Sequence, residues 1–474
     1  MSTRTLAEQP VLASGESSTN CETTETATAA AEQAKLAFAF LWLFTFVGFG
    51  RPQDLFPGLN ALHLTLASAV LGLVAYVGAL LIGRARLLWS TNVLLVLLLT
   101  GWFMVGIPFA YYRGGSFEVF TQTWLRTLIF FFLLTQTLTT VSRVKKIIWT
   151  VLLSELIASL ASIFFQGKVG LLEGDRLSGV NQGLLGWNFL GISFSVTLPF
   201  LAALYLSAIS ATTRILLAVA LGSTMWTVIL TASRGGFFGC IVSVVLTWWF
   251  VLRRSPRGRL LAVLIPIGLA VVLLKAPDVF WSRLQTIWSS SSGAETYSAQ
   301  SEGSSHLEGK LDAQSAEEST RGRQLLLENS LKYTAQFPFF GLGMGGFPLY
   351  NGRVLRRSDA WLGTHNTFTQ LSSEAGIPAL FLFLCLLFTM LGQMKKLGDQ
   401  CASNQNKFEL GLLAAATFAS TLTFAFQGFF AHIAYEYLFY YLAGIAAGLC
   451  AIAQHDSSED EPSQVSADGV AEYR

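Results

Sequence analysis

The chain has 474 residues, of which 52% are hydrophobic and only 13% are charged, and its mean hydropathy is +0.52. Soluble domains usually have about 25% charged residues, so this composition excludes an ordinary soluble domain. Apolar runs of about 17–25 residues, the length of a helix that crosses a bilayer, recur along the sequence. We therefore predict an all-α, multi-pass membrane protein. The formal net charge of +2 is uninformative, because the positions of the charges matter more than their sum.

The chain is predicted to begin with a disordered tail over residues 1–34, which are rich in Ser, Thr, Ala and Glu and have few large apolar side chains. This segment lacks the basic and apolar layout of a signal peptide, so we expect the first span to stay in the mature protein. About twelve spans follow. They are predicted over residues 35–50, 61–82, 89–108, 118–139, 147–166, 187–208, 214–231, 236–252, 259–276, 366–392, 408–429 and 432–453.

Basic residues gather in alternate short loops, all on one side of the predicted spans. They are Arg84, Arg86, Arg143, Lys145, Lys146, Arg214, Arg253, Arg254, Arg257, Arg259, Lys395, Lys396 and Lys407. Cytoplasmic loops carry an excess of Lys and Arg, so this side is predicted to be cytoplasmic. The even number of spans then places both termini in the cytoplasm. The acidic tail over residues 454–474 is also expected to be disordered.

One large loop, residues 277–365, separates the first nine spans (35–276) from the last three (366–453) and falls on the outer side. Its residues 289–320 are acidic and low in complexity, and we expect a flexible insertion there. The rest of the loop, residues 321–365, contains several arginines and four glycines in a short run. We expect this part to be functional.

Arg234 lies in the sequence SRGG, in a turn between two apolar runs at the outer side. Such a turn leaves free backbone N–H groups at the start of the next helix. Together with an arginine side chain, these groups suit a phosphate. An arginine that reaches lipid headgroups as an interfacial anchor fits the same position. The residues alone leave both interpretations open.

His365 lies in the sequence GTHN, where the large loop re-enters the membrane. A neutral imidazole can take a proton from a hydroxyl near neutral pH, and nearby arginines would lower its pKa. The alternative is an ordinary polar helix start, with Thr364 or Asn366 as the cap. Glu374 follows two turns later, where we expect it either to orient His365 or to pack between helices.

Arg126 and Glu155 lie within the fourth and fifth predicted spans. Ionisable groups inside a membrane are costly and are usually paired, so we predict a structural ion pair between them. A proton or ion path is the alternative. The five cysteines are scattered without metal-ligand spacing, and no nucleotide- or metal-binding motif occurs. We therefore predict no cofactor, metal or disulfide.

Four motifs, in order, resemble the O-antigen ligase family, which also includes O-antigen polymerases. They are RLSGVNQGLLGWNFLG with Arg176, Gly179 and Asn188; SRGG with Arg234; Arg323 followed by QFPFFGLGMGGF; and HNTFTQLSSEAGIP with His365, Asn366, Glu374 and Gly376. The resemblance covers about residues 170–430. The sequence departs from the family pattern at Leu327, where an aromatic is usual, and at Ala379, where a second glycine is usual.

The resemblance implies a metal-independent, inverting glycosyltransferase of the bacterial inner membrane that acts in surface polysaccharide or lipopolysaccharide biosynthesis. The donor would be a glycan on undecaprenyl diphosphate, and the acceptor a hydroxyl of a glycan or lipid; no nucleic-acid partner is expected. Arg234 and Arg323 would bind the diphosphate, and His365 would deprotonate the acceptor. Secondary contacts are expected from Arg176, Arg321, Arg356, Arg357, Asn366 and Glu374.

A ligase and a repeat-unit polymerase share this chemistry, and the sequence does not separate them. An anion transporter of the bicarbonate type is an alternative function. A transporter should have polar residues near the bilayer midplane and an internal repeat. Here the polar residues concentrate at the outer side, and only Arg126 and Glu155 are predicted to lie deep. A structural scaffold is the third alternative, in which the arginines and His365 would be dispensable.

Overall fold

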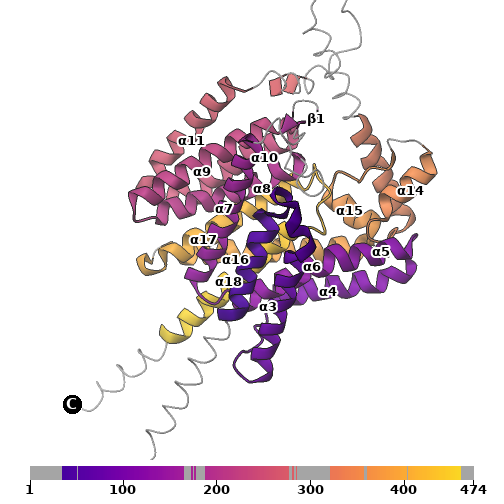
Figure 1. Cartoon of the computed structure of the whole chain (residues 1–474), viewed down its shortest axis with the longest axis horizontal. Helices are drawn as coiled ribbons and strands as arrows, with labels where there is room; N and C mark the ends of the chain where they lie inside the picture. Colours follow the sequence, from indigo (N-terminus) through magenta and orange to yellow (C-terminus); the bar gives the residue numbers. More distant parts are fainter. Residues whose placement is uncertain are drawn as a thin grey trace, which may run out of the picture.

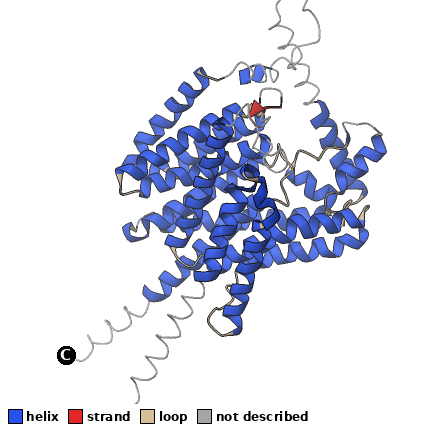
Figure 2. Cartoon of the chain, viewed as in Figure 1, coloured by secondary structure: helices blue, strands red, loops and turns tan. Residues whose placement is uncertain are grey.

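The computed structural model is almost entirely helical (Figures 1 and 2). It describes residues 35–460 except 51, 165–171, 174–175, 178–186, 277–279, 282–283, 286–320, 357–359 and 403. The tail predicted over residues 1–34, the insertion predicted over 289–320 and residues 461–474 therefore lie outside the described residues.

The elements of the first half begin with the helix Lys35–Gly50. It is followed by α2 (Pro52–Leu55), η1 (Pro57–Leu62), α3 (Leu64–Leu81), α4 (Thr91–Gly106), η2 (Ile107–Phe109), α5 (Arg113–Val119), the π-helical turn η3 (Phe120–Trp124), α6 (Leu125–Thr137) and α7 (Val141–Phe164). A two-stranded antiparallel hairpin then pairs β1 (Leu172–Glu173) with β2 (Arg176–Leu177).

The second half continues with α8 (Trp187–Ser207), α9 (Ala211–Leu230), α10 (Arg234–Phe250), η4 (Leu252–Arg254) and α11 (Pro256–Leu274). The large loop contains a helix over residues 321–336 and α14 (Gly346–Leu355). After it come α15 (Thr367–Glu374), α16 (Gly376–Gln400), η6 (Gln405–Lys407), α17 (Phe408–Gln427) and α18 (Tyr437–Asp460). The last helix thus runs past residue 453, where its span was predicted to end.

Ten helical segments of the described chain are long and apolar enough to cross a membrane. They coincide with ten of the twelve predicted spans. The other two predictions correspond to the helix Lys35–Gly50, which is shorter, and to α7, which has 24 residues. The all-α, multi-pass fold is therefore confirmed, whereas twelve crossings and their orientation stay predictions.

The tenth predicted span, residues 366–392, is two helices in the structure. The first of them, α15, ends at Glu374, and α16 begins at Gly376, whose φ of 84° is incompatible with a continuous right-handed helix. The apolar segment that fits a membrane is accordingly Gly376–Gln400. Hydropathy does not detect this break, because a glycine hardly changes the average over a window.

The central helix is α8, which packs against α9, α10 and α17. Its apolar window is 89% buried, against 17% for α11 at the edge. Small residues allow this packing. A Cβ on Gly191 would lie 3.2 Å from the Cα of Gly236, and Ser195 Oγ donates hydrogen bonds to the carbonyls of both glycines. These contacts fix the start of α10, which carries Arg234.

Candidate functional site

His365 has an unusual backbone conformation at the entrance to α15. Its φ is 53°, in the left-handed region that non-glycine residues seldom adopt and that costs about 1–3 kcal/mol. The next residue, Asn366, is the helix cap: its Oδ1 accepts hydrogen bonds from the N–H groups of Phe368 (2.9 Å) and Thr369 (3.0 Å). The cap therefore holds the turn in which His365 is strained. Strain of this kind is common at functional sites.

The connection between α17 and α18, residues 428–436, is hydrogen-bonded along α15. Thr367 N–H donates to Gly428 O, and Thr367 Oγ1 donates to Ala431 O; both bonds are 2.7 Å long. One turn further, Gln370 Oε1 accepts from Ala434 N–H at 3.0 Å. Two polar side chains of α15 thus dictate where this connection lies.

His432 is brought against His365 by these bonds. The two ring centroids are 5.0 Å apart, and the ring planes are inclined at 85°. Space for the His432 ring depends on Gly363, because a Cβ there would lie 2.7 Å from His432 Cδ2 and Nε2. His432 is not among the site residues predicted from the sequence. Its neighbours in the sequence form no motif, and only the long-range contacts identify it.

Arg323 lies on the helix over residues 321–336, which packs on α14. Leu326 and Tyr333 of this helix form a small buried core with Phe347. Asn351 of α14 is fully buried; its Oδ1 accepts hydrogen bonds from Asn329 Nδ2 and Tyr333 OH, both at 3.1 Å. Its Nδ2 donates to Ala360 O at 2.8 Å. One asparagine therefore ties the arginine-bearing helix to the segment that leads to His365.

The electrostatic surroundings keep His365 neutral. Burial, together with the neighbouring His432 and Arg323, lowers its pKa to about 3, since all three disfavour a positive charge on the ring. This effect also places the Arg323 guanidinium near the imidazole. At neutral pH the ring has an unprotonated nitrogen, as a general base requires.

We expect the pH dependence of stability to reveal this shift. The folded pKa of about 3 lies below the ordinary value of 6.5, so below pH 6.5 the unfolded chain binds a proton that the folded chain does not. The stability contributed by the neutral ring is complete above pH 6.5 and is lost as the pH falls toward 3.

Thermal unfolding between about pH 5 and 8 should therefore show wild type losing stability relative to His365→Gln as the medium becomes more acidic. Glutamine has no such titration and serves as the reference. Parallel melting curves across this range would show that the pKa of His365 is not lowered.

Arg234 is the first residue of α10. The cap of this helix is Ser233, whose Oγ accepts a hydrogen bond from Gly236 N–H at 3.2 Å. A Cβ on Gly235 would lie 3.2 Å from Phe430 Cβ, so the turn packs on the connection that carries His432. The structure thus places the Arg234 turn beside the same connection that holds His432 against His365.

Residues 215–384 match the family model described as O-Antigen ligase. The predicted resemblance to the O-antigen ligase family is confirmed. The match includes Arg234, Arg323 and His365, whereas His432 lies beyond its end. It indicates an enzyme of glycan assembly that acts on lipid-linked glycans, in a multi-pass membrane protein. No curated protein matches the chain.

Within the segment that matches the O-antigen ligase family, Glu374 anchors the glycine-rich turn of residues 341–346. Its Oε2 accepts from Gly345 N–H (3.0 Å) and its Oε1 from Phe347 N–H (3.3 Å), while its backbone carbonyl accepts from Gly343 N–H (2.8 Å). We predicted either an orienting contact with His365 or plain helix packing. The backbone bonds of the carboxylate go to the turn and to the start of α14, because the turn folds back over the end of α15. Tyr435 and Gln370 also form side-chain hydrogen bonds with it.

The predicted secondary contacts are dispersed. The backbone of Arg176 lies in the β hairpin opposite Glu173. Arg321 is exposed in the first turn of its helix, and Arg356 is the exposed C-cap residue of α14, with a φ of 54°. Arg357 lies outside the described residues. In the described part of the chain, neither Arg321 nor Arg356 forms a hydrogen bond or ion pair with His365, so these roles stay predictions.

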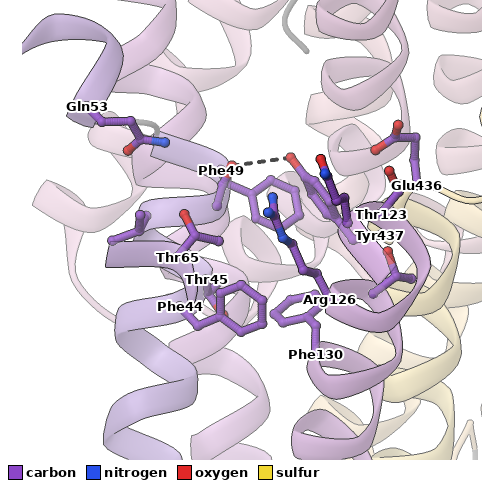
Figure 3. A pocket seen from close by; sticks show the side chains of 14 residues that line it. Phe44, Thr45, Phe49, Gln53, Thr65, Thr123, Arg126, Phe130, Glu436 and Tyr437 are labelled. Carbon is purple, nitrogen blue, oxygen red and sulfur yellow. Dashed lines mark hydrogen bonds between the residues drawn. The ribbon is translucent and has the colours of Figure 1, made fainter. Parts of the chain in front are cut away.

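The prediction of an ion pair between Arg126 and Glu155 is wrong, because the two side chains have different surroundings in the structure. Glu155 on α7 accepts hydrogen bonds from Ser193 Oγ (2.5 Å) and Thr197 Oγ1 (2.6 Å) of α8. Arg126 lines a cavity elsewhere in the bundle (Figure 3). Similar depth in two spans does not make two side chains face each other. Hydroxyl groups on the neighbouring helix satisfy the buried carboxylate instead.

Proposed function

We propose that this protein transfers a glycan from undecaprenyl diphosphate to a hydroxyl acceptor at the outer leaflet, as a ligase in surface polysaccharide or lipopolysaccharide biosynthesis. The family match supports glycosyl transfer from a lipid-linked substrate. The observation that carries the proposal is the grouping of a neutral, strained His365 with Arg323. A base beside a fixed positive charge suits an acceptor hydroxyl that attacks next to a departing diphosphate.

The reaction follows from these groups. The imidazole of His365 takes the proton from the acceptor hydroxyl as its oxygen bonds to the anomeric carbon of the donor. The bond from that carbon to the diphosphate oxygen breaks, and its electron pair leaves with the diphosphate. Attack from the face opposite the leaving group inverts the anomeric centre. Arg323 and Arg234 neutralise the charge that develops on the diphosphate, so the leaving group needs no acid to protonate it.

The expected orientation follows from the charges of the short loops. Both termini are placed in the cytoplasm, and the loop over residues 277–365 faces the periplasm or the cell exterior. A repeat-unit polymerase would use the same base and arginines and differ in taking another repeat unit as acceptor. The products of a complementation experiment distinguish these two enzymes.

In the native host, Arg234→Ala and Arg323→Ala should each abolish surface glycan and cause the lipid-linked donor to accumulate, because the charge on the leaving group is no longer neutralised. Surface polysaccharide is read on gels and the donor by lipid extraction. Lys332→Ala, an exposed cation on the same helix as Arg323, is the matched control and should behave as wild type.

The membrane level of each variant is measured in parallel. A short-chain product that survives in the arginine variants would favour the polymerase. Normal glycan in both variants at normal membrane levels would show that the diphosphate assignment is incorrect.

A further inference from the structure

A cavity of about 430 Å³ lies between the helix Lys35–Gly50, α3, α6 and the start of α18 (Figure 3). Neither His365, Arg323 nor Arg234 lines it, so it is separate from the site described above. It lies among helices predicted to span the membrane, where an empty polar space would be costly.

Arg126 is the positively charged residue of this cavity. It follows the π-helical turn η3, in which Leu125 N–H bonds back to Phe120 O; such wide turns occur frequently at functional sites. The opposite side of the helix is fixed by the fully buried Trp124, whose Nε1 donates to Thr100 Oγ1 at 3.1 Å. Arg126 is thereby directed to the cavity, where Figure 3 shows it beside Phe49.

The guanidinium of Arg126 has five N–H donors. Within the described part of the chain, no residue forms an ion pair or hydrogen bond with it. Arg126 is exposed, on a helical segment long and apolar enough to cross a membrane, where a cation is costly unless an opposite charge accompanies it. The carboxylate of Glu436 also lines the cavity, on the α18 side. An oxyanion that accepts two parallel N–H bonds is the ligand that arginine geometry favours.

The walls of the cavity are aromatic. Phe44 and Phe130 meet edge to face with centroids 5.1 Å apart, and Phe49 meets Tyr437 in the same way at 5.0 Å. Tyr437 OH also donates to Gly48 O at 3.3 Å, which joins the helix Lys35–Gly50 to α18. The cavity therefore combines a cation and a few polar groups with a rigid apolar wall, which suits an amphiphile better than a free ion.

We propose that this cavity binds the headgroup of a lipid with a net negative phosphate group, with Arg126 on the phosphate and the aromatic walls around the first methylene groups of the tail. Anionic membrane phospholipids and polyprenyl phosphates both have this chemistry. The inference does not depend on the proposed function, because the two sites share no residue.

The test is native mass spectrometry of the full-length protein in detergent, titrated with palmitoyl-oleoyl phosphatidylglycerol, with the corresponding phosphatidylcholine, and with inorganic phosphate as a competitor. We expect one saturable site that prefers phosphatidylglycerol. Arg126→Gln should weaken it about tenfold or more, through loss of a charge-assisted contact. Arg113→Gln removes an exposed cation on the neighbouring α5 and should leave the affinity unchanged.

A second variant tests whether the volume of the cavity, and not only the charge of Arg126, is needed for lipid binding. A Cβ added at Gly48 meets no atom within 4 Å, so Gly48→Leu should fill the cavity and weaken lipid binding with Arg126 still present. The proposal is overturned if no saturable site appears, if Arg126→Gln binds as wild type does, or if Gly48→Leu has no effect. Competition by inorganic phosphate as strong as that by the lipid would also reject an amphiphile as the ligand.

Discussion

Replacing His365 with Gln should lower the rate of glycan transfer by about 10²–10⁴-fold, the usual contribution of a general base. Glutamine retains polarity and approximate size but cannot accept the proton of the acceptor hydroxyl. The measurement uses protein reconstituted in proteoliposomes with a lipid-diphosphate-linked glycan and a hydroxyl acceptor. The loss should appear in kcat, with little change in the KM for the donor, because the arginines that bind the diphosphate are intact.

His63→Gln is the matched control for this variant. His63 is also a histidine with a positive φ, of 42°, at the end of η1 that precedes α3, but it has no contact with the His365 cluster among the described residues. Its replacement should leave transfer within about twofold of wild type. A His365→Gln enzyme with wild-type kcat would exclude a base at this position, whatever the behaviour of the control.

Gly376→Ala should destabilise the protein by about 2–4 kcal/mol, more than almost any other alanine substitution in the bundle. The φ of Gly376 is 84°, and a Cβ there would lie only 1.8 Å from Phe339 O. Ile377 N–H donates to Pro338 O at 2.8 Å, so the backbone has little room to move away. The substitution has to break this bond or distort the join between α15 and α16, and the glycine-rich turn depends on that join.

Gly392→Ala lies on the same helix and supplies the comparison. A Cβ at Gly392 meets nothing within 4 Å, so alanine there should be neutral or should stabilise α16 by up to about 1 kcal/mol. Thermal unfolding in detergent, read by tryptophan fluorescence, measures both variants. Equal melting temperatures would contradict the crowding that we derive for Gly376.

Hydropathy was sufficient to predict ten of the twelve spans as segments long and apolar enough to cross a membrane, because it reports on length and composition, which are local properties. Individual contacts were harder to predict. Gly376 has a left-handed backbone conformation within a long apolar segment. Hydropathy averaged over a window of residues does not detect a change of conformation at one residue. Arg126 and Glu155 were paired on depth alone, yet Ser193 and Thr197 were the nearer partners of Glu155. The direction in which a side chain points requires the helix packing to be known.

Some residues of the candidate site were predicted from the sequence, and others were not. Arg323 and His365 were identified because their motifs resemble a family, and the positive charge of Arg323 does bear on His365. His432 was missed, since its proximity to His365 depends on hydrogen bonds between residues more than sixty positions apart, such as Thr367 to Ala431. The hydrogen bond from Gly345 N–H to the Glu374 carboxylate was missed for the same reason. A short sequence motif does not indicate which distant backbone N–H group a carboxylate will bind.

The bonds between α15 and the connection over residues 428–436 also have a consequence for biosynthesis. Thr367 and Gln370 acquire their partners Gly428, Ala431 and Ala434 only after α17 has been inserted into the bilayer. A nascent chain that stops before residue 428 would thus contain the complete family-matching segment and still lack His432 and the hydrogen bonds that join α15 to this connection. We therefore expect the full set of contacts around His365 to form only once the chain through residue 434 has been made.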